Sequence, residues 1–260
     1  MSLPEDLSRF STLVDIIAKL RAPDGCPWDN KQTHASLRKN LLEECYEVLE
    51  ALDEGSADTL CEELGDLLMQ VVLHAQIATE AREFELGDVV NRITTKLIHR
   101  HPHIFGSKEV KDAEEVALNW ETLKQEERGP DTSILASVPE QMPALSYSQE
   151  MQHRVAQVGF DWADIDGVIE KLTEEISELK QADSQERKAQ EFGDLLFTLA
   201  NIARRLGIDS EAALREANKR FYRRFTCMEE ACRQRGLKFG ELSFGEQNAL
   251  WEEAKRKLQE

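Results

Sequence analysis

Residues 43–66 read EECYEVLEALDEGSADTLCEELGD, and residues 174–194 read EEISELKQADSQERKAQEFGD. Both segments contain E-E-x-x-E followed by E-x-x-D, and the loop inside the pattern is three residues shorter in the second copy. Apolar residues recur at helical spacing through both segments, which predicts two amphipathic helices joined by a short loop in each. The chain therefore contains an internal repeat of a helix pair.

The apolar stripes of these four predicted helices favour an all-α fold. In the first copy the stripes are Leu41, Cys45, Val48, Leu49 and Leu52, then Leu64, Leu67, Leu68, Val71 and Val72; in the second they are Leu172, Ile176 and Leu179, then Phe192, Leu195, Leu196, Leu199 and Ile202. No run of the sequence alternates apolar and polar residues with β-branched enrichment, as a strand would. We therefore expect two tandem helical-bundle domains.

Proline and glycine mark the boundary between the two domains. Gly129, Pro130, Pro139 and Pro143 interrupt helices between residues 127 and 148. We predict an N-terminal domain at 1–127, a linker at 128–148 and a C-terminal domain at 149–260. A loop around Pro23 to Pro27 precedes the first acidic helix, and Thr33 is expected to cap that helix.

The acidic residues point to a divalent cation. The candidate ligands are Glu175, Glu178, Glu191 and Asp194 in the second copy and Glu44, Glu47, Glu63 and Asp66 in the first. Residues three or four apart share a helix face, and antiparallel packing would bring each set of four together. Two unit charges about 4 Å apart repel by roughly 4 kcal/mol at an effective dielectric of about 20, so such a cluster needs protons or metal. One acidic helix face is usually a solvated surface, but its duplication favours Mg²⁺ or Mn²⁺.

Cations and tryptophan extend the repeat beyond the acids. Lys96 and Arg100 align with Arg220 and Arg224, and Trp120 and Lys124 align with Trp251 and Lys255. Arg220 and Arg224 are one helical turn apart, a spacing that suits phosphate oxygens, although a solvated basic face has the same pattern. Trp251 either stacks on a base or closes the bundle by packing.

Composition excludes several partners. With 50 acidic and 32 basic residues the net charge is -18, which opposes binding to nucleic acid polymers and anionic membranes. The five scattered cysteines are expected to be reduced thiols in a cytoplasmic protein. Neither a signal peptide nor a membrane span is expected.

The repeated acidic pattern resembles the MazG family of nucleoside triphosphate pyrophosphohydrolases, which is related to the all-α dimeric dUTPases. Gly25-Cys26-Pro27-Trp28-Asp29 and Gln32-Thr33-His34 also resemble the full-length, tandem-domain members of that family. The resemblance implies Mg²⁺-dependent hydrolysis of nucleoside triphosphates to monophosphate and diphosphate, a homodimer, and a role in cleaning the nucleotide pool. It further implies that Glu174 orients or deprotonates the attacking water.

The two copies differ in charge. The second copy has Lys171, Arg187 and Lys188 where the first has uncharged Asn40, Thr59 and Leu60. Fixed cations near a triphosphate stabilise its charge, so we expect the C-terminal copy to be the main catalytic domain. The expected substrate contacts there are Lys171, Arg187, Lys188, Arg220, Arg224, Trp251 and Lys255. The N-terminal copy would bind metal while serving regulation, assembly or a different substrate.

Two alternatives belong to other classes. A di-iron bundle requires paired Glu-x-x-His motifs, and only Glu150-x-x-His153 fits, without a repeat. The second alternative is a non-catalytic helical module for dimerisation or nucleotide sensing, whose acids form a solvated face. The histidines at 99, 101 and 103 surround Pro102 and are expected to mark a helix end rather than a metal site.

Overall fold

The structure is a computed structural model that describes residues 6–128 and 132–258. Helices joined by loops make up the described ranges, which contain no strand, and this confirms the all-α prediction. The chain divides into two compact units, Met1–Glu127 and Arg128–Glu260. Among the described helices none combines the length and apolar character that a membrane span requires.

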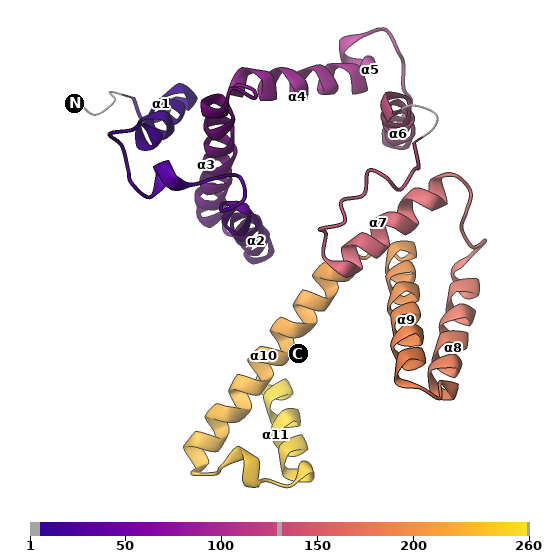
Figure 1. The fold of residues 1–260 in the computed structure, drawn as a ribbon. Helices are drawn as coiled ribbons and strands as arrows, with labels where there is room; N and C mark the ends of the chain where they lie inside the picture. Colours follow the sequence, from indigo (N-terminus) through magenta and orange to yellow (C-terminus); the bar gives the residue numbers. More distant parts are fainter. Residues whose placement is uncertain (1–5, 129–131, 259–260) are drawn as a thin grey trace. The chain divides into compact units, whose positions relative to one another are not determined.

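The first unit is built around an antiparallel helix pair (Figure 1). Its elements are α1 Phe10–Arg21, η1 Asp29–Lys31, α2 Arg38–Glu54, α3 Ala57–Ala81, α4 Leu86–Arg100, α5 Pro102–Phe105 and α6 Ala113–Arg128. Gly55 ends α2 in the left-handed region at φ +70°, and Ser56 caps α3 by accepting a hydrogen bond from the Thr59 N–H at 3.3 Å. This tight turn folds α3 back along α2. Helix α1 packs on α3 around Ile17, Val72 and Leu73.

The loop between α1 and α2 is held by Arg21, whose side chain is 5% exposed. Its guanidinium donates to Glu80 on α3 and to the carbonyl oxygens of Asp29 and Gln32, at 2.5 and 3.1 Å for the two carbonyls. The prediction that Thr33 caps α2 is wrong. Helix α2 begins at Arg38 without a side-chain cap, and the Thr33 hydroxyl instead accepts from the Ser36 N–H at 3.1 Å.

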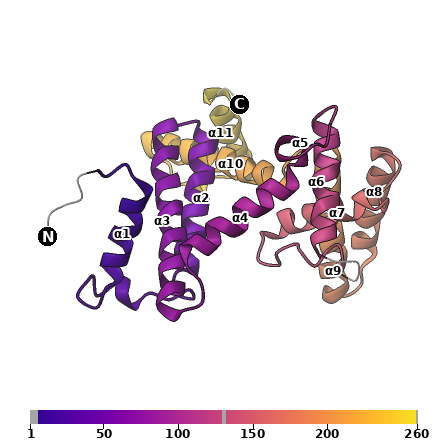
Figure 2. The ribbon, with the colours of Figure 1, turned by 90° about the horizontal axis from the view of Figure 1, so that it is seen from above.

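The second unit repeats the helix pair and adds a long arm. Its elements are α7 Ala144–Gln157, α8 Ile165–Gln181, α9 Gln185–Arg205, α10 Ser210–Arg235, η2 Phe239–Glu241 and α11 Phe244–Lys257. Helices α8 and α9 form the antiparallel pair, α7 packs on α9, and α11 folds back on α10 (Figures 1 and 2). The contact between α10 and α11 is a core of Met228, Cys232, Leu250 and Ala254. Helix α7 begins inside the segment predicted as a linker.

The apolar stripes predicted on these helices are only partly buried. Val72 is 2% exposed on α3, but Leu64 and Leu68 on the same helix are 48% and 41% exposed. On α9 Phe192 is 51% exposed. The stripes are wider than the contact between two helices, so each pair keeps an apolar face on its outside.

The histidine-rich segment marks a helix end, as predicted. Helix α4 ends at Arg100, His101 follows as its C-cap, and Pro102 starts the short α5. Proline is favoured at the first position of a helix because its missing N–H would have no partner there.

Candidate functional site

The acidic residues of the second unit meet between α8 and α9. Oxygen atoms of Glu175, Glu178 and Glu191 all lie within 4.8 Å of one another. Glu175 is buried, with 4% of its side chain exposed, and Glu191 is 13% exposed. Asp194, one turn after Glu191 on α9, is exposed and lies outside this group. Three of the four predicted ligands are therefore brought together.

Two of the basic side chains that were predicted to bind the substrate form ion pairs with these acids. The Nζ atom of Lys171 lies 2.7 Å from Glu175 Oε1 and 3.0 Å from Glu174 Oε1. Hydrogen bonds to these two carboxylates raise the pKa of Lys171. The guanidinium of Arg187 lies 3.7 Å from Glu191 Oε1, while Lys188 is exposed. The buried negative charge of the cluster is thus balanced from within the α8–α9 pair.

The first unit holds the equivalent cluster with different electrostatics. Oxygen atoms of Glu44, Glu63 and Asp66 lie within 4.8 Å of one another, whereas Glu47 is exposed and outside the group. Within the described ranges no ion pair to these three acids is found. Burial raises the pKa of Glu44, which Asp66 and Glu47 raise further while a hydrogen bond from Gln70 opposes them. Burial and neighbouring acids also raise the pKa of Glu63.

Gln70 is a site residue that the sequence reasoning missed. Its amide donates to Glu44 Oε1 at 3.3 Å, and the residue is 3% exposed. Gln70 follows Asp66 by four residues on α3, so it lies on the same helix face as the acids. That spacing was the available signal, but an uncharged side chain does not stand out in an acidic segment.

The predicted nucleotide contacts of the C-terminal arm lie on α10 and α11. The guanidinium carbon of Arg224 lies 5.3 Å from the ring centroid of Trp251, and the ring of Phe221 is 5.5 Å away. Lys255 pairs with Glu252 at 2.5 Å, and Arg220 is exposed. Helices α10 and α11 pack on each other, whereas the acidic cluster lies between α8 and α9. Packing thus accounts for one face of Trp251, and its role in binding a base stays a prediction.

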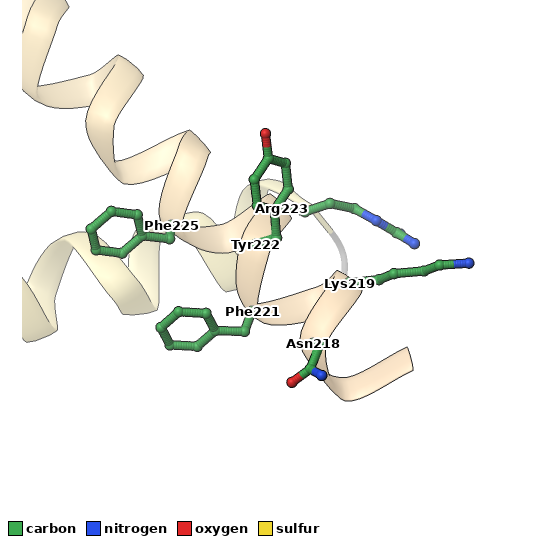
Figure 3. Close-up of a pocket in the computed structure, with 6 residues that line it drawn as sticks. All are labelled: Asn218, Lys219, Phe221, Tyr222, Arg223 and Phe225. Atoms are coloured by element: carbon green, nitrogen blue, oxygen red, sulfur yellow. The ribbon is translucent and has the colours of Figure 1, made fainter. Parts of the chain in front are cut away.

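A groove of about 500 Å³ lies along α10. Figure 3 shows the residues that line it. Phe221 and Phe225 point to one side of the helix, and Lys219 and Arg223 point to another. Tyr222 is 72% exposed. Lys219 and Arg223 are therefore separated from the aromatic side chains of α10 that pack toward α11.

The residues of the di-iron alternative are engaged elsewhere. The Glu150 carboxylate accepts from Arg154 Nε at 2.6 Å, and His153 contacts Gln157 at 3.1 Å. The clusters of side chains in the described ranges that could hold a metal ion consist of carboxylates and include no histidine. This geometry disfavours a site built on Glu150 and His153.

Comparisons with known proteins identify the family of this chain. The family model described as MazG nucleotide pyrophosphohydrolase domain matches residues 32–105. The chain is 46% identical to the nucleoside triphosphate pyrophosphohydrolase/pyrophosphatase MazG of Thermotoga maritima, across 95% of each protein. The chain belongs to the MazG family. The nucleoside triphosphate pyrophosphohydrolase of Escherichia coli K12 is 41% identical over 96% of this chain and 98% of that protein.

Three further similarities cover part of one of the two proteins compared or part of this chain. The uncharacterized protein YabN of Bacillus subtilis is 45% identical over 95% of this chain but only 51% of its own length. A crystal structure of a mazG-related protein from Thermotoga maritima matches 44% of this chain and 97% of that one, at 29% identity and a TM-score of 0.39. Residues 136–221 match the model for phosphoribosyl-ATP pyrophosphohydrolase. Both halves thus match pyrophosphohydrolase models, which confirms the prediction of an enzyme of this class.

Proposed function

We propose that this chain hydrolyses nucleoside triphosphates to the monophosphate and diphosphate with the help of Mg²⁺. The observation that carries the proposal is the convergence of three carboxylates in each unit, Glu175, Glu178 and Glu191 being the second set. Relatives of nearly the same length are named nucleoside triphosphate pyrophosphohydrolases. The proposed setting is a cytoplasmic enzyme that cleans the nucleotide pool.

The acidic clusters fit a hard divalent cation. Their oxygen atoms are close enough to share one ion, and Mg²⁺ or Mn²⁺ prefers oxygen ligands. Glu175, Glu178 and Glu191 would hold it in the second unit, with Asp194 as a fourth ligand; Glu44, Glu63 and Asp66 would do so in the first, with Glu47 as the fourth. Burial, together with the neighbouring acids, raises the pKa values of Glu44 and Glu63, and a bound cation would favour their charged forms. The ion, when bound, neutralises charge on the triphosphate oxygens.

Glu174 is proposed as the residue that positions the attacking water. Its side chain is 57% exposed beside the cluster, and Lys171 holds one of its oxygens at 3.0 Å. A carboxylate there accepts one proton of the water as the oxygen bonds to phosphorus. Attack on the α-phosphorus breaks its bond to the bridging oxygen, and diphosphate leaves with that oxygen. Attack on the β-phosphorus instead breaks the bond between the β-phosphorus and the bridging oxygen, and the monophosphate leaves with that oxygen.

We assign the main catalytic role to the C-terminal domain, residues 149–260, and a secondary role to the N-terminal domain, residues 1–127. Lys171, Arg187 and Lys188 give the second cluster cations that the first lacks. A bound triphosphate would compete with Glu174 and Glu175 for Lys171. The ammonium group would then exchange a carboxylate for a phosphate oxygen, so it would lose no further water. Arg220, Arg224, Trp251 and Lys255 would complete the substrate contacts.

A homodimer accounts for the uncovered faces of the helix pairs. On the α8–α9 pair Ile176, Phe192, Leu196 and Leu199 are 39–51% exposed. An antiparallel pair with an apolar outer face becomes a four-helix bundle when a second copy covers it. A second copy could also bring its α10 cations to the acidic cluster. Replacing Phe192 by Glu should convert a dimer into a monomer in sedimentation, and a monomeric wild type would contradict the assembly.

Product analysis tests the activity directly. The purified chain with Mg²⁺ and a nucleoside triphosphate should release monophosphate and diphosphate in equal amounts, separated by anion-exchange chromatography. Release of a nucleoside diphosphate and orthophosphate would show that the bond between the β and γ phosphates is cleaved instead. A protein without Mg²⁺-dependent turnover, and without a change of melting temperature on adding metal and nucleotide, would instead be a non-catalytic module.

A further inference from the structure

Two polar side chains, Gln70 and His74, lie one turn apart on α3 in the first unit. Residues four apart share a helix face, so these two side chains lie next to each other. Gln70 is 3% exposed, and Val72 and Leu73 between them belong to the apolar core. A polar group in such surroundings destabilises the fold unless it finds a hydrogen-bond partner.

Each of the two side chains has one polar end paired and the other unpaired. The Gln70 amide donates to Glu44 Oε1 at 3.3 Å, and Nδ1 of His74 lies 2.7 Å from Nδ1 of His34. The other two atoms, Gln70 Oε1 and His74 Nε2, are buried and have no hydrogen-bond partner among the described residues. The two unpaired atoms thus belong to adjacent side chains, and pairing them would remove both penalties.

The contact between His34 and His74 has the geometry of an N–H···N hydrogen bond. The two rings are parallel to within 1°, and their centroids are 5.0 Å apart. The N–H bond and the nitrogen lone pair both lie in the ring plane, so they can point at each other across the 2.7 Å gap. Burial lowers the pKa of His74, and the neighbouring His34 lowers it further, which keeps the His74 ring neutral.

The direction of this hydrogen bond determines what His74 offers at its other nitrogen. If His34 donates, the proton of the neutral His74 ring is on Nε2, and this N–H is a donor beside the unpaired acceptor of Gln70. If His74 donates instead, its Nε2 is an acceptor, and two acceptors are left side by side. The first tautomer is therefore the favourable one. A direct contact or one buried water molecule can join Nε2–H to Gln70 Oε1.

The second unit does not carry this pair of side chains. By the alignment of the two acidic motifs, Thr198 stands where the first unit has Gln70, and Ile202 stands where it has His74. The helix pair of the second unit therefore packs without an amide or an imidazole at these positions. Packing alone does not account for Gln70 and His74 in the first unit.

We propose that a hydrogen-bond chain through Gln70 and His74 positions the Glu44 carboxylate for the metal ion of the first unit. His34 donates to His74 Nδ1, and His74 Nε2–H donates to Gln70 Oε1 directly or through one water molecule. The Gln70 amide then donates to Glu44. All donors point the same way, from an exposed ring to the acidic cluster, and such chains strengthen each of their hydrogen bonds.

The chain acts on the orientation of one metal ligand. The hydrogen bond from Gln70 engages Oε1 of Glu44 and fixes the plane of the carboxylate, which leaves Oε2 for the ion. Gln70, His74 and His34 are thus positioning residues. This inference rests on the proposed function, because it takes the cluster of Glu44, Glu63 and Asp66 to hold a divalent cation.

The affinity of the first unit for Mn²⁺ is measured by electron paramagnetic resonance on the full chain. The background variant Glu175→Ala with Glu178→Ala removes two ligands of the second unit, so the ion that it binds belongs to the first. In this background Gln70→Leu should weaken Mn²⁺ binding by roughly tenfold. The matched control is Gln76→Leu on the same helix, where the amide donates to Glu80 at 3.1 Å, and it should stay within about twofold.

Nitrogen-15 NMR of the imidazole rings tests the direction of the chain in the metal-free wild type. His74, assigned by the signal that His74→Leu removes, should carry its proton on Nε2 and a lone pair on Nδ1. His34→Leu replaces an exposed ring, so folding should persist. It removes the donor to His74, so the Nδ1–H tautomer of His74 should appear and Mn²⁺ binding should weaken by about threefold. A residue that only fills space would change neither readout.

The inference is overturned if Gln70→Leu, shown to be folded by circular dichroism, binds Mn²⁺ as tightly as Gln76→Leu. It is also overturned if wild-type His74 carries its proton on Nδ1. A background variant that binds no Mn²⁺ would instead refute the metal site proposed for the first unit, and the His74 tautomer would still test the hydrogen-bond chain.

Discussion

The guanidinium of Arg224 lies over the indole ring of Trp251, with its central carbon 5.3 Å from the ring centroid. The aligned residues of the first unit, Arg100 and Trp120, form the same pair at 5.7 Å. The repeat therefore preserves a cation–aromatic contact as well as the acids. The attraction between a cation and a ring face restricts the guanidinium to one position. The indole of Trp251 therefore determines the direction in which the N–H groups of Arg224 point.

Truncating Trp251 should therefore destabilise the α10–α11 hairpin. Trp251→Ala removes a half-buried ring that contacts Phe221 and Arg224, so we expect a loss of about 2–4 kcal/mol. Trp251→Phe keeps a ring for the cation and should lose about 1 kcal/mol. Urea denaturation followed by circular dichroism measures both. Equal losses for the two variants would show that the ring face contributes nothing.

Replacing Glu174 by Gln tests its role beside the cluster. The variant keeps the size of the side chain but removes the proton acceptor, so kcat should fall by about 10² to 10⁴. Mn²⁺ binding, measured by electron paramagnetic resonance, should stay within about twofold because Glu174 is not among the three converging acids. Turnover close to that of the wild type would move the proton acceptor to another residue.

Lys171 forms ion pairs with both Glu174 and Glu175. Its replacement should increase the thermal stabilisation by Mg²⁺ but decrease the activity. Lys171→Met leaves Glu175, which is 4% exposed, without its 2.7 Å ion pair. An unpaired buried charge is costly, so the metal-free variant should melt at a lower temperature and gain more from added Mg²⁺ than the wild type. Diphosphate release should nevertheless fall. Lys180→Met, an exposed position on the same helix, provides the control.

The sequence allowed the convergence of Glu175, Glu178 and Glu191 to be predicted, because helical spacing and a short loop leave antiparallel packing as the simple solution. It did not reveal that the Asp194 carboxylate lies apart from these three, since the direction of one carboxylate depends on its side-chain rotamer. The ion pair between Lys171 and Glu175 also depends on the rotamers of the two side chains. His34 and His74 come together only through tertiary packing between the loop before α2 and α3, which periodicity along one helix cannot reveal.

The ion pair of Arg21 and Glu80 predicts how the first unit responds to acid. Hydrogen bonds from Arg21 hold the pKa of Glu80 below its usual value, although burial opposes them. A carboxyl with a lowered pKa in the folded state stabilises the fold above its unfolded pKa, and this contribution is lost as the pH falls through the folded pKa. The stabilisation that Glu80 contributes should therefore decline below about pH 4.5.

Glu80→Gln isolates that contribution. The variant should lose about 1–2 kcal/mol at neutral pH, where a partly exposed ion pair to buried Arg21 is broken. Its melting temperature should change less than that of the wild type between about pH 5 and about pH 3. Glu83→Gln, at an exposed position after α3, should keep the wild-type pH dependence. Identical curves for Glu80→Gln and the wild type would contradict this linkage.

The division of labour between the two clusters is tested by paired substitutions. Glu175→Ala with Glu178→Ala should remove nearly all diphosphate release, whereas Glu44→Ala with Glu47→Ala should leave much of it. The reason is electrostatic: the second cluster has Lys171 and Arg187 within reach, and one charge-assisted contact to phosphate contributes about 1.5–3 kcal/mol.

Both double variants should first be shown to fold and to keep the oligomeric state of the wild type, and then assayed at saturating Mg²⁺ with the same nucleotide. The first cluster has the raised carboxyl pKa values, so it is the one with the greater electrostatic need for a cation. Metal affinity and catalytic rate can therefore rank the two units in opposite orders. If the N-terminal pair proves the more damaging for turnover, cations from elsewhere must complete the first site, and the assignment of the main catalytic domain is reversed.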